Sequence, residues 1–186
     1  MMKKVLILYG TRYGSTEEIS QELAKVLEDN DIETQLINLE TSKKSDLPSL
    51  DEFDGILLGS GIQIGKWTKK ARKFVKKYAD KLKSNENMLG VFVSCGDGGN
   101  PEKRDQARNN YIKKVLEPYN INAGMLEAFG GVLDLTEDSK IGKISKKMLM
   151  MAAKEDPNIK PNDKNDLRDW DRIKDFGKKF CELLNK

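Results

Sequence analysis

Histidine is absent from the 186-residue sequence. This absence removes the commonest general base in enzymes, every Ser-His or Cys-His nucleophile pair and the usual zinc-water enzymes. Any difficult chemistry is therefore expected to belong to a bound cofactor rather than to a side chain.

Cysteine is scarce as well, because only Cys95 and Cys181 are present. The two residues lie far apart and form no Cys-x-x-Cys pair, so neither a disulfide framework nor a structural zinc site is supported. We expect two free thiols. For Cys95, which lies in a glycine-rich stretch, packing as a small buried residue is favoured over reactivity.

Long apolar runs and strong net charge are also missing. No run is long enough to span a bilayer, and the apolar stretch after Lys3-Lys4 is too short for a signal peptide, so we expect a cytoplasmic protein. The net charge of +3 is too slight to indicate nucleic-acid binding. Because no long Pro-, Gly- or Ser-rich linker interrupts the chain, residues 1–186 are expected to form a single domain.

Short apolar runs alternate with helical patterns along the chain. Strands are expected at 5–9, 32–39, 56–58, 89–93 and around 125–135, and helices at 19–27, 71–82, 101–118 and 170–184. The continuous apolar runs are typical of strands that helices cover on both faces, whereas 32–39 alternates as a strand near the sheet edge does. This order predicts an α/β fold, a doubly wound five-stranded parallel sheet with helices on both faces.

Two segments between these elements have unusual composition. Basic residues from 69 to 77 surround the apolar face of the helix expected there, and we interpret them as a solvated face rather than a nucleic-acid or partner patch. The connection from about 136 to 169 is long enough to be an insertion ahead of the last helix. Within it, the 140–154 segment places apolar residues on one helical face with lysines, including Lys146 and Lys147, beside them; these apolar residues are Ile141, Ile144, Met148, Met151 and Ala152. We favour packing on the same domain or in a homodimer for this segment, and peripheral membrane contact is the alternative.

The most informative segment is Thr11-Arg12-Tyr13-Gly14-Ser15-Thr16, where the first strand leads into a helix. Its three hydroxyls can donate to phosphate oxygens, and the free N–H groups at the helix start add the positive end of the helix dipole. The turn lacks the Lys-Ser/Thr ending of a P-loop, so a terminal monophosphate suits it better than a triphosphate. The alternative is that Thr11 and Ser15 only cap the helix.

Two further glycine-rich turns follow later strands, so three turns can line one crevice. One contains Ser60, Gly61, Ile62, Gln63, Ile64 and Gly65 with Trp67 shortly after, and the other contains Ser94, Cys95, Gly96, Asp97, Gly98 and Gly99. Gly59, Gly61 and Gly65 miss the Gly-x-Gly-x-x-Gly spacing of nicotinamide-binding domains by one residue. A phospho-acceptor receiver domain would need an aspartate where this chain has Ser60.

Thr11, Gly14 and Thr16 match, position by position, the Thr-x-x-Gly-x-Thr motif of the flavodoxin superfamily, which the sequence resembles over essentially its whole length. Further segments resemble the branch that contains menaquinone-dependent protoporphyrinogen oxidase; they are Gly59-Ser60-Gly61-Ile62, Gly65-Lys66-Trp67, Phe74-Val75-Lys76-Lys77, Pro101-Glu102-Lys103-Arg104 and the insertion ahead of Asp169-Trp170. The resemblance implies FMN as cofactor, with its phosphate on the first turn and its ring between the two later loops. It also implies a redox partner protein or a quinone as electron partner.

The sequence departs from many flavodoxins in its aromatic residues. The 94–100 loop has none, and Trp67 is as well suited to core packing as to flavin stacking, so Ile62 and Ile64 could cover the ring instead. Asp97 is interpreted as a turn former. We predict an FMN-binding flavodoxin-type redox protein without a catalytic side chain or metal, and flavin-dependent protoporphyrinogen oxidation with a quinone acceptor is the alternative.

Overall fold

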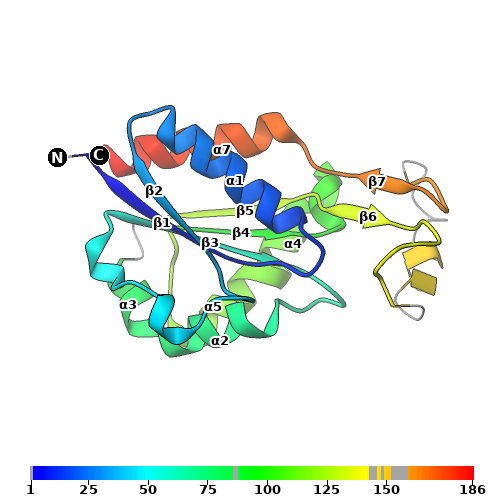
Figure 1. Ribbon diagram of the computed structural model, residues 1–186, viewed down its shortest axis with the longest axis horizontal. Helices are drawn as coiled ribbons and strands as arrows, with labels where there is room; N and C mark the ends of the chain where they lie inside the picture. The colour runs from blue at the N-terminus through cyan, green and yellow to red at the C-terminus, as the bar shows by residue number, and fades with distance from the viewer. Residues whose placement is uncertain (1, 86–87, 143–145, 148, 152–158) are drawn as a thin grey trace.

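A five-stranded parallel sheet forms the centre of the computed structural model, which describes residues 2–85, 88–142, 146–147, 149–151 and 159–186. The strands lie in the order β2-β1-β3-β4-β5 (Figure 1). They are β1 (Lys4–Gly10), β2 (Glu33–Asn38), β3 (Gly55–Gly61), β4 (Leu89–Ser94) and β5 (Met125–Phe129). The predicted doubly wound α/β fold is confirmed, and the second strand lies at an edge of the sheet as expected.

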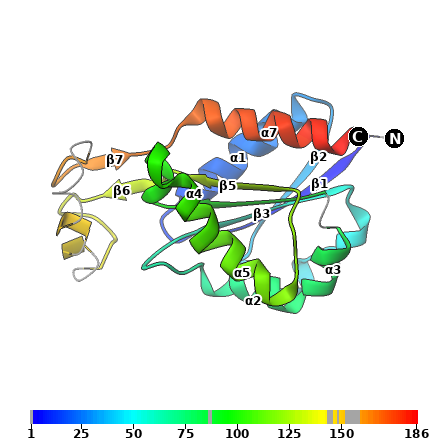
Figure 2. The ribbon, with the colours of Figure 1, turned by 180° about the vertical axis from the view of Figure 1, so that it is seen from behind.

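Helices cover both faces of this sheet (Figures 1 and 2). One face carries α1 (Ser15–Glu28) and α7 (Trp170–Leu184), and the other carries α2 (Lys69–Lys77), α3 (Ala79–Ser84), α4 (Arg104–Ala107) and α5 (Lys114–Leu116). Alternate residues of β1 belong to two separate hydrophobic clusters, with Leu6 on one side and Val5 and Ile7 on the other. Burial on both faces explains why this strand reads as an unbroken apolar run.

Two of the predicted helices are interrupted. The helix expected at 71–82 is divided at Tyr78 into α2 and α3. The segment from Pro101 to Tyr119 changes from 3-10 to α-helical, then to a π-helical stretch at Arg108–Lys113, and then back. π-Helical turns are rare in proteins overall, but those that occur are frequently found at functional sites.

The predicted strand around 125–135 is wrong in its extent, because β5 ends at Phe129. After Gly130-Gly131 the chain forms β6 (Val132–Asp134), which pairs antiparallel with β7 (Lys164–Asp166). A Cβ atom on Gly130 would lie 1.8 Å from the Leu167 carbonyl oxygen, so the glycine lets two chain segments touch where the strand breaks. The β6–β7 ribbon projects beyond the sheet, at the end opposite to the two termini (Figure 1).

The ribbon leads to the 140–154 segment, of which part is described. Residues 146–147 and 149–151 are helical, and Met151 is 63% exposed. Lys146 Nζ donates a hydrogen bond to the Thr136 carbonyl oxygen. The other predicted members of the apolar face, Ile144, Met148 and Ala152, lie outside the described residues.

Candidate functional site

The three turns singled out in the sequence meet at the carboxyl edge of the sheet. Strand register places Gly10 opposite Ser60, Gly61 opposite Ser94, and Ser94 opposite Phe129. The 11–16, 61–67 and 94–99 loops therefore leave neighbouring strands at one level. This edge is where open α/β sheets bind their ligands.

The first loop ends at the N-terminus of α1, which therefore lies at this edge of the sheet. Gly14 is the N-cap of α1 with φ 97°, and no side chain of the described residues caps the helix. Thr11 Oγ1 accepts a hydrogen bond from Gly14 N–H at 3.0 Å, which shapes the loop itself. Neither Thr11 nor Ser15 is the N-cap residue of α1, and the Thr11 hydroxyl instead holds the N–H of the N-cap residue Gly14.

Thr16 carries an unsatisfied hydroxyl at this position. The residue is 1% exposed, and its Oγ1 has no hydrogen-bond partner within the part of the chain that the structure describes. A buried polar group without a partner costs on the order of 1–3 kcal/mol. An oxygen of a bound anion would satisfy this hydroxyl, and the first N–H groups of α1 would stabilise its charge. The loop thus fits a phosphate group.

Serine side chains connect the three loops where they leave the strands. Ser15 Oγ lies 3.1 Å from Ser94 Oγ, which joins the first loop to the end of β4. Ser60 is fully buried, and its Oγ accepts the Thr68 N–H at 3.1 Å. Ser60 is therefore positioned to hold the start of α2 rather than to contact a ligand directly.

Arg12 joins the first loop to the second. Its guanidinium donates to the carbonyl oxygens of Gly61 at 2.8 Å and Trp67 at 2.9 Å. Burial lowers the pKa of Arg12, and the nearby charge of Glu40 opposes this shift. Arg12, which was predicted to bind the cofactor, instead directs its guanidinium to backbone carbonyl groups of the second loop.

The tip of the second loop is strained and exposed. Backbone hydrogen bonds in both directions pair Gln63 with Lys66, which places Ile64 at φ 49° and Gly65 at φ 69°. A β-branched residue with positive φ is a genuine conformational outlier, and such strain is found at binding and switch sites. Ile64 is 68% exposed, and Tyr13 beside it accepts a hydrogen bond from Gln63 Nε2. Both side chains are exposed and form one rim of the carboxyl edge of the sheet.

Trp67 lies in the core and turns away from this rim. It is 3% exposed, packs in the hydrophobic cluster below α2, and donates its indole N–H to the Tyr111 carbonyl oxygen. In this position the ring has no free face for a flavin. The structure places Trp67 in the core, which was one of the two interpretations left open by the sequence.

Tyr111, which the sequence analysis did not select, connects the two later loops. Its carbonyl oxygen receives the Trp67 N–H, and its hydroxyl donates to Asp97 Oδ2 at 2.9 Å. Burial and the hydrogen bond to Asp97 raise the pKa of Tyr111 to about 12, so the hydroxyl stays protonated. Tyr111 lies in the π-helical stretch, but in the sequence it reads only as one apolar residue of a helical pattern.

The third loop is shaped by its glycines. Asp97 opens a 3-10 turn that includes Gly98 and Gly99. A Cβ atom on Gly98 would lie 2.2 Å from the Phe129 carbonyl oxygen, whereas one on Gly96 would have no described atom within 4 Å. Gly98 is therefore needed for close packing on β5, and Gly96 borders open space.

Cys95 is buried in the same loop at 6% exposure. Burial raises the pKa of its thiol to about 12, an effect that the nearby Asp97 charge reinforces and the loop N–H groups partly offset. The thiol is protonated at neutral pH and is not a nucleophile, in agreement with the packing role expected from the sequence.

Two other kinds of site can be assessed from the described residues. Within 2–85, 88–142, 146–147, 149–151 and 159–186, no cluster of acidic and cysteine side chains is suited to hold a metal ion. In those same ranges no helix has the length and apolar character needed to cross a membrane.

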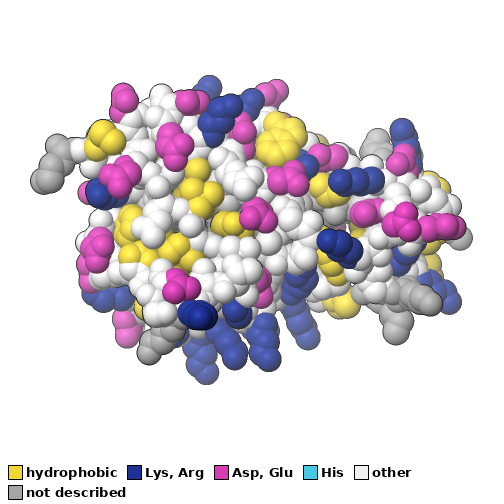
Figure 3. Space-filling model, in the orientation of Figure 1, with side chains coloured by type: hydrophobic (Ala, Val, Ile, Leu, Met, Phe, Trp, Pro, Cys, Tyr) yellow, Lys and Arg dark blue, Asp and Glu magenta, His cyan; other side chains and the backbone are white. Residues whose placement is uncertain are grey.

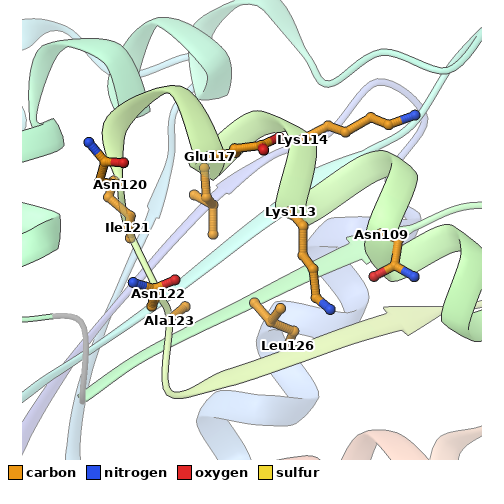
Figure 4. Close-up of a pocket in the computed structure, with 10 residues that line it drawn as sticks. Asn109, Lys113, Lys114, Glu117, Asn120, Ile121, Asn122, Ala123 and Leu126 are labelled. Atoms are coloured by element: carbon orange, nitrogen blue, oxygen red, sulfur yellow. The ribbon is translucent and has the colours of Figure 1, made fainter.

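A cavity of about 580 Å³ lies away from the three loops (Figure 4). It is formed by the 109–123 segment and the start of β5, and Lys113 and Leu126 extend toward each other from its two sides. Its position beside an edge strand separates it from the carboxyl edge, so it is not part of the candidate site.

The sheet order and the three loops at its carboxyl edge define a flavodoxin-like α/β domain with a hydroxyl-bearing turn at the start of its first helix. In agreement, a family model described as a flavodoxin domain matches residues 6–160. The chain therefore belongs to the flavodoxin domain family.

Comparisons with individual proteins extend over nearly the whole chain. It is 26% identical over 184 residues to "Protoporphyrinogen IX dehydrogenase [quinone]" of Escherichia coli (strain K12), covering 98% of this chain and 97% of that protein. Oxidised Flavodoxin 1 from Bacillus cereus superposes with a TM-score of 0.52 at 18% identity, covering 97% of this chain and 98% of that one. Rubredoxin oxygen:oxidoreductase from Desulfovibrio gigas superposes with a TM-score of 0.61 at 13% identity over 98% of this chain, but this chain spans only 36% of its length.

Proposed function

We propose that the chain binds FMN at the carboxyl edge of the sheet and transfers electrons through the flavin. The observation that carries this proposal is the buried, unpartnered Thr16 hydroxyl at an uncapped helix start, within a Thr-x-x-Gly-x-Thr turn. A bound flavin would supply the redox chemistry, which fits a chain without histidine and with its loop thiol buried.

The chain's own residues would bind and orient the cofactor. We propose that Thr11, Ser15 and Thr16 donate hydrogen bonds to the phosphate, with the N–H groups of the first turn of α1. The ring would lie between the 61–65 and 94–99 loops, where Ile62 and the exposed Ile64 offer aliphatic surface and Tyr13 lies alongside. Trp67 and Ser60 would support the loops from below.

An absorption spectrum and a titration with flavins test this assignment. The purified protein is expected to show a flavin spectrum or to take up FMN with quenching of flavin fluorescence. FMN should bind at least about tenfold more tightly than FAD, because the turn is built for a terminal monophosphate. A preference for FAD, or no flavin binding by a folded protein, would contradict the assignment.

A second candidate function is oxidation of protoporphyrinogen with a quinone as electron acceptor. It is favoured by the similarity to the Escherichia coli protein over nearly the full length of both chains. The assay is anaerobic turnover of protoporphyrinogen with a soluble quinone, followed by the fluorescence of the porphyrin product. Turnover that requires both the quinone and FMN would support it, whereas FMN binding without turnover would leave the carrier function.

The 140–154 segment is proposed as a contact surface, either for a second copy of the chain or for a membrane. Membrane contact predicts binding to anionic vesicles that weakens as salt rises and when Lys146→Glu and Lys147→Glu are combined. A matched control combines Lys25→Glu and Lys178→Glu on the α1 and α7 face and should keep vesicle binding. Absence of vesicle sedimentation at low salt would exclude the membrane contact.

A further inference from the structure

Helix α2 presents a strongly basic surface directly beside the candidate site. Six of its residues are basic and none is acidic, and all six are exposed; they are Lys69, Lys70, Arg72, Lys73, Lys76 and Lys77. Figure 3 shows Lys and Arg side chains gathered along the lower edge of the molecule, where α2 lies in Figure 1. We call this surface the α2 basic face.

The charges of the α2 basic face are not balanced by the domain itself. None of the six side chains forms a salt bridge with a carboxylate of the described residues. Lys70 Nζ donates to the Glu40 carbonyl oxygen at 2.6 Å, and Lys77 Nζ lies 4.9 Å from the Tyr78 ring centre. Neither contact supplies a formal negative charge. Like charges at three- and four-residue spacing repel one another, so an external anion would relieve a local cost.

A groove beside α2 adds an apolar surface to this charge. It has a volume of about 180 Å³ and lies between α2 and the 39–47 segment. The partly exposed Leu47 and Tyr78 contribute the apolar surface above the buried Leu39 and Phe74. The charge comes from Lys43, Lys70, Lys73 and Lys77. A ligand that matches this groove carries apolar groups flanked by carboxylates.

The α2 basic face is held firmly to the candidate site. Thr68 caps α2 by accepting the Ala71 N–H, and its own N–H donates to Ser60 at the end of β3. Trp67, just before this cap, is held by Arg12 from the first loop. The first turn of α2, which carries Lys70 of the groove, therefore adjoins the 61–67 loop.

The sequence alone favoured a solvated face for these residues, and the groove beside them is the observation that changes this interpretation. We propose that the groove of the α2 basic face binds an acidic amphipathic segment of a redox partner protein. This inference rests on the proposed function, because electron transfer requires a partner docked at the start of α2 to lie near the proposed flavin site. A concave groove with an apolar interior favours a protruding peptide segment over the flat surface of a bilayer. Nucleic acid is disfavoured because exposed stacking aromatics do not alternate with the lysines.

A fluorescent helical peptide with glutamates on one face and leucines on the other serves as the probe. Binding is measured by anisotropy with the full-length protein, and a scrambled peptide of equal charge serves as the ligand control. The Lys73→Glu, Lys77→Glu variant is expected to lose at least about tenfold in affinity, and wild-type binding should weaken as salt rises. The control variant Lys25→Glu, Lys178→Glu changes net charge equally on the opposite face of the sheet and should change affinity by less than about twofold.

A second variant tests the apolar part of the groove without changing charge. Leu47→Ala should weaken binding of the amphipathic peptide while leaving the weak binding of the scrambled peptide unchanged. Equal loss in the α2 and control variants, or equal binding of both peptides, would overturn the proposal. The proposal would also be overturned if the protein bound anionic vesicles or duplex DNA more tightly than the amphipathic peptide and only the Lys73→Glu, Lys77→Glu variant lost this binding. Peptide binding does not require flavin, so this result is independent of the FMN titration.

Discussion

Replacing Thr11 and Thr16 together by alanine is expected to lower FMN affinity by at least about a hundredfold. Each hydroxyl would donate to a charged phosphate, and a hydrogen bond to a charged group contributes about 1.5–3 kcal/mol, so two such losses exceed the free energy of a hundredfold change. Fluorescence titration with FMN measures the effect. Thr16 Oγ1 lacks a partner among the described residues, whereas Thr11 Oγ1 accepts the Gly14 N–H, so Thr16→Val alone should lower FMN affinity without breaking a hydrogen bond of the flavin-free protein.

A double variant at the opposite edge of the sheet provides the control for this measurement. Thr34→Ala, Ser84→Ala removes two hydroxyls, one near the start of β2 and one at the end of α3, away from the 11–16 loop. This variant should bind FMN like the wild type. Unchanged FMN affinity of the Thr11→Ala, Thr16→Ala variant would show that the phosphate lies elsewhere.

The substitution Gly98→Ala is expected to disrupt the third loop. Its Cβ would meet the Phe129 carbonyl oxygen at 2.2 Å and the carbonyl carbon at 2.4 Å, and these backbone atoms cannot turn aside as a side chain could. The loop must shift from the end of β5, which would also disturb the hydrogen bond between Tyr111 and Asp97. We expect a loss of about 1–3 kcal/mol in the free energy of unfolding and at least about a tenfold loss in FMN affinity.

Gly142→Ala is the matched control, because it adds the same methyl group outside the three loops. Gly142 has no positive φ, and a Cβ there meets no described atom within 4 Å. Urea denaturation and FMN titration should distinguish the two variants clearly. Equal stability and equal affinity would mean that the contact between Gly98 and β5 does not shape the flavin loop.

The central sheet could be predicted because its information is local in the sequence. Apolar runs such as 5–9 are continuous where both faces are buried, and the polar alternation of 33–38 marks the edge strand. Once the strands are parallel, the turns after them must meet at one edge of the sheet. The position of the Thr11–Thr16 turn beside two glycine-rich loops followed from this topology alone.

The contacts that shape the candidate site could not be predicted, because they join residues distant in sequence. Tyr111 reaches Asp97 across 14 positions, and Arg12 reaches Trp67 across 55. The sequence offered two interpretations for Trp67, and only the packing of the 101–119 segment against it selects one. The pair Gly130-Gly131 is a local signal for a break after β5, but the contact of Gly130 with the distant Leu167 could not be predicted from it.

The β6–β7 ribbon has a consequence for how this chain can change over evolutionary time. Asp134 lies directly opposite Lys164, so the long excursion between them leaves and rejoins the domain at one point. Doubling the length of such an excursion adds only about 0.6 kcal/mol to the cost of closing it. A change in the length of the excursion is therefore expected to affect the folding of the sheet little. Selection can modify the length of the excursion and the three loops at the carboxyl edge separately, because the two regions are linked through Gly130, Gly131 and Leu167.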